Sequence, residues 1–164
     1  MSTYHPTKFT KFDDYSTPAS AWKAIKQYIP KHKTIWEPFW SDGKSGEYLK
    51  RLGFKVVHDK SLNFFYEDRG AIVVTNPPYS DLPMVLERLV KTLDKPFIMI
   101  LPTSKINTKY FREILGKNID QIQLIIPKKR IQFDRIPESK KKNCNFDTFY
   151  YCYKMNLPKD IIFL

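Results

Sequence analysis

The sequence predicts an α/β fold: a mostly parallel, twisted sheet with helices on both faces and one antiparallel strand late in the chain. Short apolar runs rich in β-branched residues alternate with segments that carry apolar residues at helical spacing. Glycine, proline or polar residues separate these segments. The last two apolar runs have no long helix between them, so we expect them to pair antiparallel.

Each predicted helix combines helical apolar spacing with a start or stop signal. The first stops before Pro30, the second is closed by Gly53 and the fourth by Gly116. The third has Asp81 as N-cap and Pro83 in its first turn. The helices are expected over residues 19–28, 44–52, 82–93 and 108–115.

The predicted strands are short apolar runs, and residues 1–18 are expected to be irregular. In open sheets of this kind, ligands bind at the carboxyl ends of the strands. The loops that follow the first four strands are therefore expected on one edge of the sheet. The strands are expected over residues 34–39, 54–57, 71–75, 97–101, 119–126 and 146–153, and the loops over 37–46, 58–65, 76–81 and 102–107.

Composition limits the class of protein. A chain of 164 residues with 42% hydrophobic residues predicts one domain with a packed core. A net charge of +11 favours a polyanionic partner, although many small basic proteins are merely soluble. Cys144 and Cys152 have no metal-site spacing and are interpreted as free thiols in a reducing, cytoplasmic compartment, with a nuclear or virion-associated location as the alternative. The polar start and the lack of an 18-residue apolar run predict neither signal peptide nor membrane span.

The most informative motif is Asn76-Pro77-Pro78-Tyr79, which directly follows the apolar run at 71–75. The prolines fix the backbone and hold the Asn76 side chain and the nearby carbonyls in one stiff geometry. Those oxygens can accept hydrogens from a flat amino group, and the Tyr79 ring can stack beside it. The motif therefore indicates methylation of an amide-like or aromatic amine.

Other polar and small residues follow the first two predicted strands. The loop over 37–46 contains small residues that let a backbone approach a ligand closely, although a plain strand-to-helix turn looks the same. Asp59 stands about 20 residues later, where a carboxylate can bind ribose hydroxyls, or can simply be solvated in a turn. Asn63 and Phe64 offer an amide and a ring to a purine, while Phe64 alone fits a core position equally well.

Taken together, these residues resemble the S-adenosylmethionine-dependent amino-methyltransferases, and among them the N6-adenine methyltransferases. The resemblance runs in order over residues 13–153 and implies a Rossmann-like class I methyltransferase fold that binds S-adenosyl-L-methionine. It implies that the segment Asp14–Pro18 wraps the methionine part of the cofactor. The implied cofactor-binding residues are Tyr15, Ser16, Thr17, Pro18, Glu37, Pro38, Phe39, Ser41, Gly43, Gly46, Asp59, Asn63 and Phe64.

The same resemblance implies a mechanism that needs no metal. The Asn76 side-chain oxygen and the Pro77 carbonyl would accept the two hydrogens of the adenine amino group. The nitrogen then moves toward tetrahedral geometry, and its lone pair becomes available for the sulfonium methyl group. The implied catalytic residues are Asn76, Pro77, Pro78 and Tyr79.

Three features depart from the family pattern. Ser41 stands where relatives usually have glycine, and Asn63 stands where an aspartate commonly accepts a hydrogen from the cofactor's adenine amino group. An asparagine oxygen can accept the same bond without charge assistance. Many members that act on DNA also have a separate target-recognition domain, for which 164 residues leave no room, so a second copy or a partner protein could supply specificity.

A basic run at residues 128–142 is the remaining feature. It is interpreted as a phosphate clamp beside the base, because it brackets Phe133, which resembles the aromatic residue that holds a flipped base in the family. The alternatives are a core position for Phe133 and a solvated loop for the run. The expected nucleic-acid-binding residues are Phe133, Lys128, Lys129, Arg130, Arg135, Lys140, Lys141 and Lys142.

The leading hypothesis is N6-adenine methylation of DNA, and three alternatives remain. Methylation of adenosine in RNA uses the same chemistry on an already exposed base. Protein glutamine N5-methyltransferases share the tetrapeptide, but they usually carry an N-terminal helical domain. A non-catalytic binding protein could have kept the fold.

Overall fold

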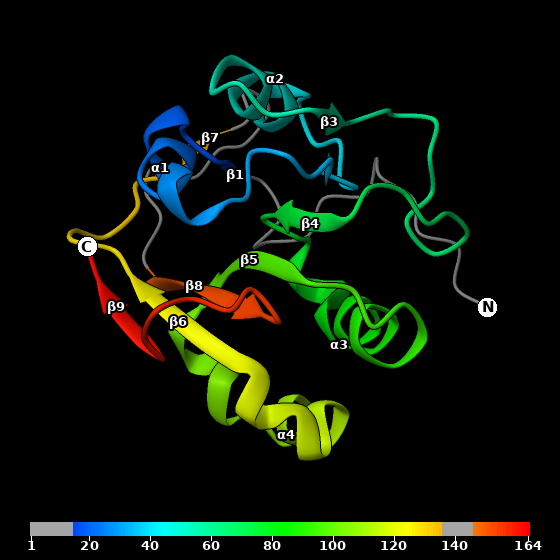
Figure 1. The fold of residues 1–164 in the computed structure, drawn as a ribbon, viewed down its shortest axis with the longest axis vertical. Coiled ribbons are helices and arrows are strands. Elements are labelled where there is room, and N and C mark those ends of the chain that lie inside the picture. Colours follow the sequence, from blue (N-terminus) through cyan, green and yellow to red (C-terminus); the bar gives the residue numbers. More distant parts are fainter. Residues whose placement is uncertain (1–14, 136–145) are drawn as a thin grey trace.

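The computed structural model of this protein describes residues 15–135 and 146–164. Their centre is a seven-stranded sheet with the order β3-β2-β4-β5-β8-β6-β9 (Figure 1). Neighbouring strands pair in parallel except on the two sides of β8, which runs against both β5 and β6. The predicted α/β class, the mostly parallel sheet and the antiparallel late strand are therefore confirmed.

Most predicted elements occur with shorter bounds. The segment predicted as one helix over 19–28 divides into an α-helix and a 3₁₀ turn, η1 (Lys26–Tyr28), and the one over 82–93 ends in a π-helical stretch, η3 (Arg88–Thr92). The α-helices are α1 (Ala19–Lys23), α2 (Lys44–Arg51), α3 (Leu82–Glu87) and α4 (Lys109–Leu115). The corresponding strands are β2 (Ile35–Trp36), β3 (Val56–Val57), β4 (Ile72–Thr75), β5 (Phe97–Pro102), β6 (Ile122–Ile126) and β8 (Thr148–Tyr153).

Three short strands lie outside the predicted set. β1 (Tyr15–Ser16) pairs antiparallel with β7 (Asp134–Arg135) in a separate two-stranded sheet. This pairing corrects the expectation that the segment up to residue 18 is irregular, for the part that is described. β9 (Ile161–Phe163) pairs in parallel with β6 and forms one edge of the main sheet.

Two apolar layers cover the sheet. α1 and α2 lie on one face, and α3 and α4 lie on the other (Figure 1). The side chains of β5 alternate between the layers: Ile98 and Ile100 pack on the α1 side, while Phe97, Met99 and Leu101 pack on the α3 side. All five are fully buried, so the central strand is apolar on both faces.

The sheet direction positions the site. Because β2, β3, β4 and β5 are all parallel, their carboxyl ends lie on one edge, and the loops that follow them are neighbours there, as predicted. No helix in the described part of the chain is long and apolar enough to cross a membrane.

Candidate functional site

The Asn76–Tyr79 motif starts where β4 ends, and its first side chain is fixed by two hydrogen bonds. Asn76 Nδ2 donates to Thr17 Oγ1 at 3.0 Å, and Asn76 Oδ1 accepts from the Tyr79 hydroxyl at 2.7 Å. Thr17 is 3% exposed and directly follows β1. The structure therefore brings the N-terminal segment and the Asn76–Tyr79 motif, which are 59 residues apart, into direct contact.

The backbone of the motif has the geometry that its prolines dictate. Pro78 is extended, with φ −64° and ψ 118°, and it precedes the 3₁₀ turn η2 (Tyr79–Asp81). Asp81 occupies the N-cap position of α3 and a proline stands in the first turn of that helix, as predicted, but the Asp81 side chain makes no capping hydrogen bond. Pro77 is buried. The chain thus passes from strand to helix within a few residues, which leaves the Asn76 amide little freedom.

Four aromatic residues form a cluster beside Asn76. Phe146, which the sequence placed only at the start of a strand, is its centre. Its ring stacks on Phe133 at 5.8 Å between centroids and meets Tyr79 and Tyr15 edge-on, at 5.7 and 6.2 Å. Tyr79 and Phe133 are only 8% and 7% exposed. Neither ring is open to a stacked base here, which differs from the prediction, because each packs against Phe146 instead.

Glu37 is a buried carboxyl group at the end of β2. Its Oε1 accepts hydrogen bonds from the Thr75 hydroxyl at 2.6 Å and from the Phe39 backbone N–H at 3.0 Å. Burial raises the pKa of Glu37 to about 8, although both hydrogen bonds oppose the shift. The group is therefore protonated at neutral pH in this structure, and its charged form would need a cationic partner.

The loop over 37–46 turns through backbone that favours glycine. Ser41 has φ +51° and Gly43 has φ +79°, both in the left-handed region. A β-carbon at Gly43 would lie 2.7 Å from the Trp40 ring, and one at Gly46 would lie 2.2 Å from the His58 ring. The missing side chains thus make room for rings of this chain, which differs from the predicted role of admitting a ligand.

Trp40 and His58 stack on each other over these glycines, with centroids 4.6 Å apart and planes 15° from parallel. His58 Nδ1 lies 2.8 Å from the Glu37 carbonyl oxygen. Since a carbonyl only accepts, Nδ1 carries the proton of the neutral ring. Burial lowers the pKa of His58, and its buried Nε2 has no hydrogen-bond partner among the described residues.

A small pocket of about 140 Å³ opens beside this stack. It brings together Asp59 and Asn63, the residues predicted to bind the ribose and the adenine, and Pro38. Asp59 is exposed, and two hydrogen bonds from Ser61 lower the pKa of its carboxyl group. Asn63 Oδ1 accepts from the Phe65 N–H at 2.9 Å, so part of its acceptor capacity serves the local turn. The pocket has room for part of a nucleoside.

Phe64 does not line this pocket. Its ring is 1% exposed and packs against Trp36, Phe39 and Phe65, so it is a core residue rather than a platform open to a purine. The Arg88 guanidinium lies 5.7 Å from the centroid of the same ring.

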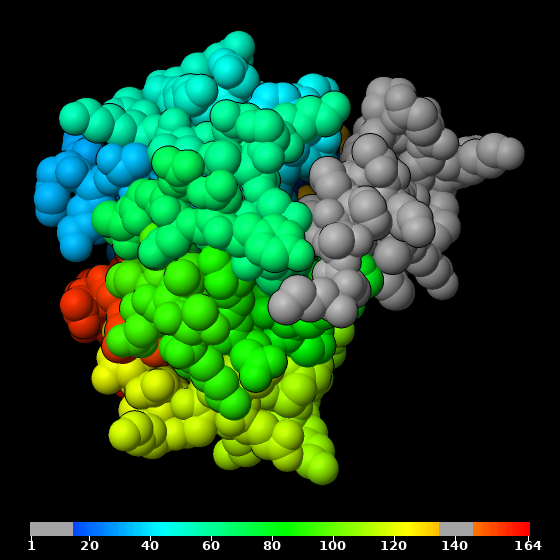
Figure 2. Space-filling model, turned by 90° about the vertical axis from the view of Figure 1, so that its right-hand side faces the viewer, coloured from blue at the N-terminus to red at the C-terminus, as the bar shows by residue number. Residues whose placement is uncertain are grey.

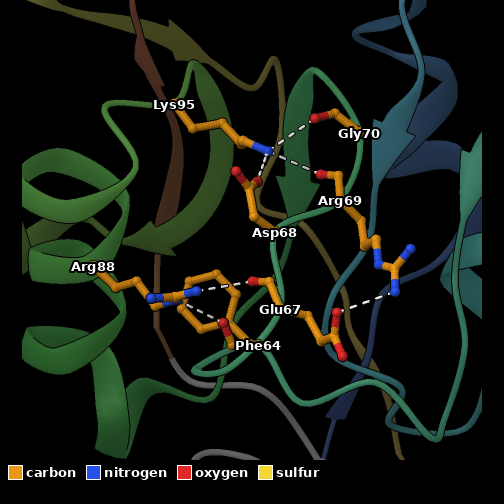
Figure 3. A network of polar contacts seen from close by, with 7 residues as sticks. All are labelled: Phe64, Glu67, Asp68, Arg69, Gly70, Arg88 and Lys95. Atoms are coloured by element: carbon orange, nitrogen blue, oxygen red, sulfur yellow. Dashed lines mark hydrogen bonds and ion pairs between the residues drawn. The ribbon is translucent and has the colours of Figure 1, made fainter.

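Two cations on the α3 side hold the connection between β3 and β4 (Figure 3). Arg88 donates to the Phe64 and Glu67 carbonyls at 2.7 and 2.9 Å. The Lys95 ammonium group donates to the Arg69 and Gly70 carbonyls at 3.0 and 2.8 Å and to the Asp68 carboxylate. The connection (turquoise) lies directly above α3 (green) in Figure 2. These bonds fix the backbone that directly follows the pocket residue Asn63.

The predicted basic run is only partly described. Lys128 and Lys129 are exposed, whereas Arg130 forms a two-point ion pair with Asp147, at 2.7 and 3.2 Å. Arg135 belongs to β7, where its backbone lies opposite that of Tyr15 in β1. Lys140, Lys141 and Lys142, like Asp14 and Cys144, lie outside the described residues. The remaining predicted residues, Ser16 and Pro18, stand in β1 and at the N-cap of α1.

No protein-family model and no curated protein sequence matches this chain. The solved structures that align with this chain include two with the following descriptions. One is described as a class I S-adenosylmethionine-dependent methyltransferase from Listeria monocytogenes, with 12% identity and a TM-score of 0.48 over 96% of this chain and 67% of that one. The other is described as an RNA methyltransferase from Pyrococcus horikoshii, with 19% identity and a TM-score of 0.48 over 91% and 94%. Both names give the activity as provisional.

Proposed function

We propose that this protein is a methyltransferase that uses S-adenosyl-L-methionine to methylate the N6 amino group of adenine in DNA. The observation that carries the proposal is the fixed orientation of the Asn76 amide. Its nitrogen donates to Thr17 and its oxygen accepts from Tyr79, so one acceptor site of the oxygen remains for an incoming amine. An orientation that is set before the substrate arrives costs no reorganisation during the reaction.

Asn76 and Pro77 act as hydrogen-bond acceptors in this proposal. A side-chain amide oxygen has two acceptor sites, of which the Tyr79 hydroxyl uses one. The second accepts one hydrogen of the adenine amino group, and the Pro77 carbonyl accepts the other. Both bonds draw the nitrogen lone pair out of conjugation with the ring, so that the nitrogen becomes a better nucleophile.

S-adenosyl-L-methionine would supply an activated methyl group on a sulfonium centre. Three side chains of this protein suit individual parts of that cofactor. The ionised Asp59 carboxylate suits ribose hydroxyls, and the Asn63 amide suits the adenine edge. Glu37 suits a cationic group, since a nearby positive charge would favour its ionised form.

The choice of DNA rests on charge and aromatic content. A net charge of +11 attracts a polyanion, and the exposed Lys128 and Lys129 follow β6 on the way to Phe133. The cluster of Tyr15, Tyr79, Phe133 and Phe146 beside Asn76 would receive the base by opening the Phe133–Phe146 stack. Base stacking on an aromatic ring contributes about 1–3 kcal/mol, which offsets the cost of flipping.

The proposal is tested by incubating the full chain with methyl-labelled S-adenosylmethionine and four acceptors: duplex DNA, single-stranded DNA, RNA and a glutamine-containing protein. We expect label in DNA alone. Label only in RNA or only in protein would refute the proposed substrate. Donor binding by calorimetry without transfer to any acceptor would favour a binding protein that has kept the fold.

A further inference from the structure

We propose a second DNA-binding surface on α1, η1 and the turn that follows them, formed by Lys23, Lys26 and Lys31 and called here the lysine patch. It would bind the sugar-phosphate backbone of duplex DNA outside the basic run at 128–142. The inference rests on the proposed function for its choice of DNA, but it concerns binding and can be tested without methyl transfer.

Charge is the first observation. Between Asp14 and Glu37 the chain has no acidic residue, while it has four lysines, at positions 23, 26, 31 and 33, and His32. None of the four lysines forms an ion pair or a hydrogen bond with its side chain within the described ranges 15–135 and 146–164. By contrast, Lys91, Lys109 and Lys154 each lie within 4.0 Å of a carboxylate. The segment thus presents positive charge that no residue in the described part of the chain neutralises.

Shape is the second observation. The three patch lysines line a surface depression of about 550 Å³, together with Ala24, Gln27, Ile29 and Pro30. Its lining contains no carboxylate, and the neutral residues between the lysines are small, apolar or amide groups. This depression is several times larger than the pocket beside Asp59. It is wide and cationic, as binding of a phosphate backbone requires, rather than deep and apolar as for a small molecule.

Rigidity is the third observation. The opposite side of the same segment is buried, with Trp22 and Ile25 at 0% exposure. The Tyr150 hydroxyl donates to the Ala21 carbonyl at 2.6 Å, and Trp22 Nε1 donates to Ser45 Oγ at 3.2 Å. The helix that carries Lys23 is therefore bonded to both β8 and α2, and η1, which carries Lys26, follows it directly, so a bound backbone would be held at a fixed position.

Position links the patch to the candidate site. α1 begins at its N-cap, Pro18, which is the residue next to Thr17, the hydrogen-bond partner of Asn76. Lys23 is five residues after Pro18 in the chain, which corresponds to about 7.5 Å along a helix. A duplex whose target base enters beside Asn76 would meet Lys23 with a flanking phosphate, and a backbone that continues past η1 toward the start of β2 would reach Lys26 and Lys31.

The test measures affinity for a labelled duplex by fluorescence anisotropy over a range of salt concentrations. The full chain is compared with a triple variant, Lys23→Gln, Lys26→Gln and Lys31→Gln. Each lost phosphate contact should reduce the slope of log affinity against log salt by about 0.9, so the triple variant should lose about 2.7. A Lys→Arg triple variant at the same positions should keep the slope, because it keeps the charge.

A matched control separates a local contact from net charge. Lys55→Gln, Lys117→Gln and Lys159→Gln remove the same charge from exposed positions on other elements. Equal slopes for the patch variant and this control would overturn the inference, as would a patch effect seen with RNA but not with duplex DNA. Methyl transfer is measured in parallel. A protein that methylates nothing but loses its salt slope in the patch variant would refute the proposed function and support the lysine patch.

Discussion

The amide nitrogen of Asn76 donates a hydrogen bond to the hydroxyl of Thr17 at 3.0 Å. The two residues come from segments 59 positions apart, and Thr17 is almost fully buried. If this contact orients Asn76, then removing one hydroxyl far along the chain should change the chemistry at the Asn76–Tyr79 motif.

Replacing Thr17 with valine keeps its volume and removes the hydroxyl. We expect methyl transfer to slow by roughly 10- to 100-fold, because a misoriented Asn76 amide would raise the activation free energy by about 1.5–3 kcal/mol. We also expect the free energy of unfolding to fall by about 1–2 kcal/mol, because a buried hydrogen bond is lost. Single-turnover transfer and urea unfolding measure the two effects. Thr17→Ser keeps the hydroxyl and should retain most of both, whereas an equally active Thr17→Val variant would show that the contact does not orient Asn76.

Ser41 adopts φ +51°, which costs a residue with a side chain about 1–2 kcal/mol. Glycine should relieve that strain at the cost of a more flexible unfolded chain, so we expect Ser41→Gly to gain about 0.5–1 kcal/mol in the free energy of unfolding. Urea denaturation measures this difference in the free energy of unfolding. Ser41→Ala retains a β-carbon in the same backbone and should gain nothing. A destabilised glycine variant would mean that the Ser41 hydroxyl makes a favourable contact.

The buried carboxyl group of Glu37 should make stability depend on pH. Its pKa in the folded protein is about 8, above its ordinary value of 4.5, so the folded state holds a proton that the unfolded state releases. The resulting stability is complete below pH 4.5 and is lost as pH rises through 8. We expect the wild type to lose about 1–2 kcal/mol between pH 7 and 8.5 relative to Glu37→Gln.

The comparison with Glu37→Gln also removes the contribution of His58. That residue has a lowered pKa, so it stabilises the folded state increasingly as pH rises toward its ordinary value of 6.5, in both proteins alike. Thermal or urea unfolding at several pH values provides the data. Parallel pH profiles for the two proteins would mean that Glu37 is already ionised at neutral pH.

Lys95 holds the connection between β3 and β4 through two backbone carbonyls and is 8% exposed. Lys95→Met should cost about 2–3 kcal/mol of stability, since both carbonyls lose their charged donor. Asp68, its acidic partner, is 55% exposed, so Asp68→Asn should cost less than about 1 kcal/mol. Urea unfolding of both variants distinguishes them; similar losses would place the stabilisation in the ion pair rather than in the carbonyl contacts.

The sequence predicted the parts of the fold that repeat a pattern. β4 and β5 are apolar runs and were predicted to within one residue at each end. β1 and β7 contain only two residues each, too few for any periodicity, and they pair across more than 100 positions of the chain. β9 is apolar in sequence but only three residues long, and it buries Ile162 alone while Ile161 and Phe163 are exposed.

In the candidate site, the sequence predicted which segments meet but not how their side chains fill the space. Thr17 and Asn76 were placed in separate motifs and are in contact. The Trp40–His58 stack over Gly43 and Gly46 is a packing arrangement that residue spacing does not encode. Phe146 was missed because its importance comes from the three aromatic residues around it, two of which, Tyr15 and Tyr79, lie far away in the sequence.

The most direct measurement is nucleoside analysis of duplex DNA after incubation with S-adenosylmethionine and either the wild type or Asn76→Ala. Asparagine at this position is expected to act on the amine and not on the donor, so donor affinity by calorimetry should be similar in the two proteins. We expect N6-methyldeoxyadenosine from the wild type and none from Asn76→Ala. Methylation of another nucleoside, or full activity in Asn76→Ala, would contradict the proposed role of the Asn76–Tyr79 motif.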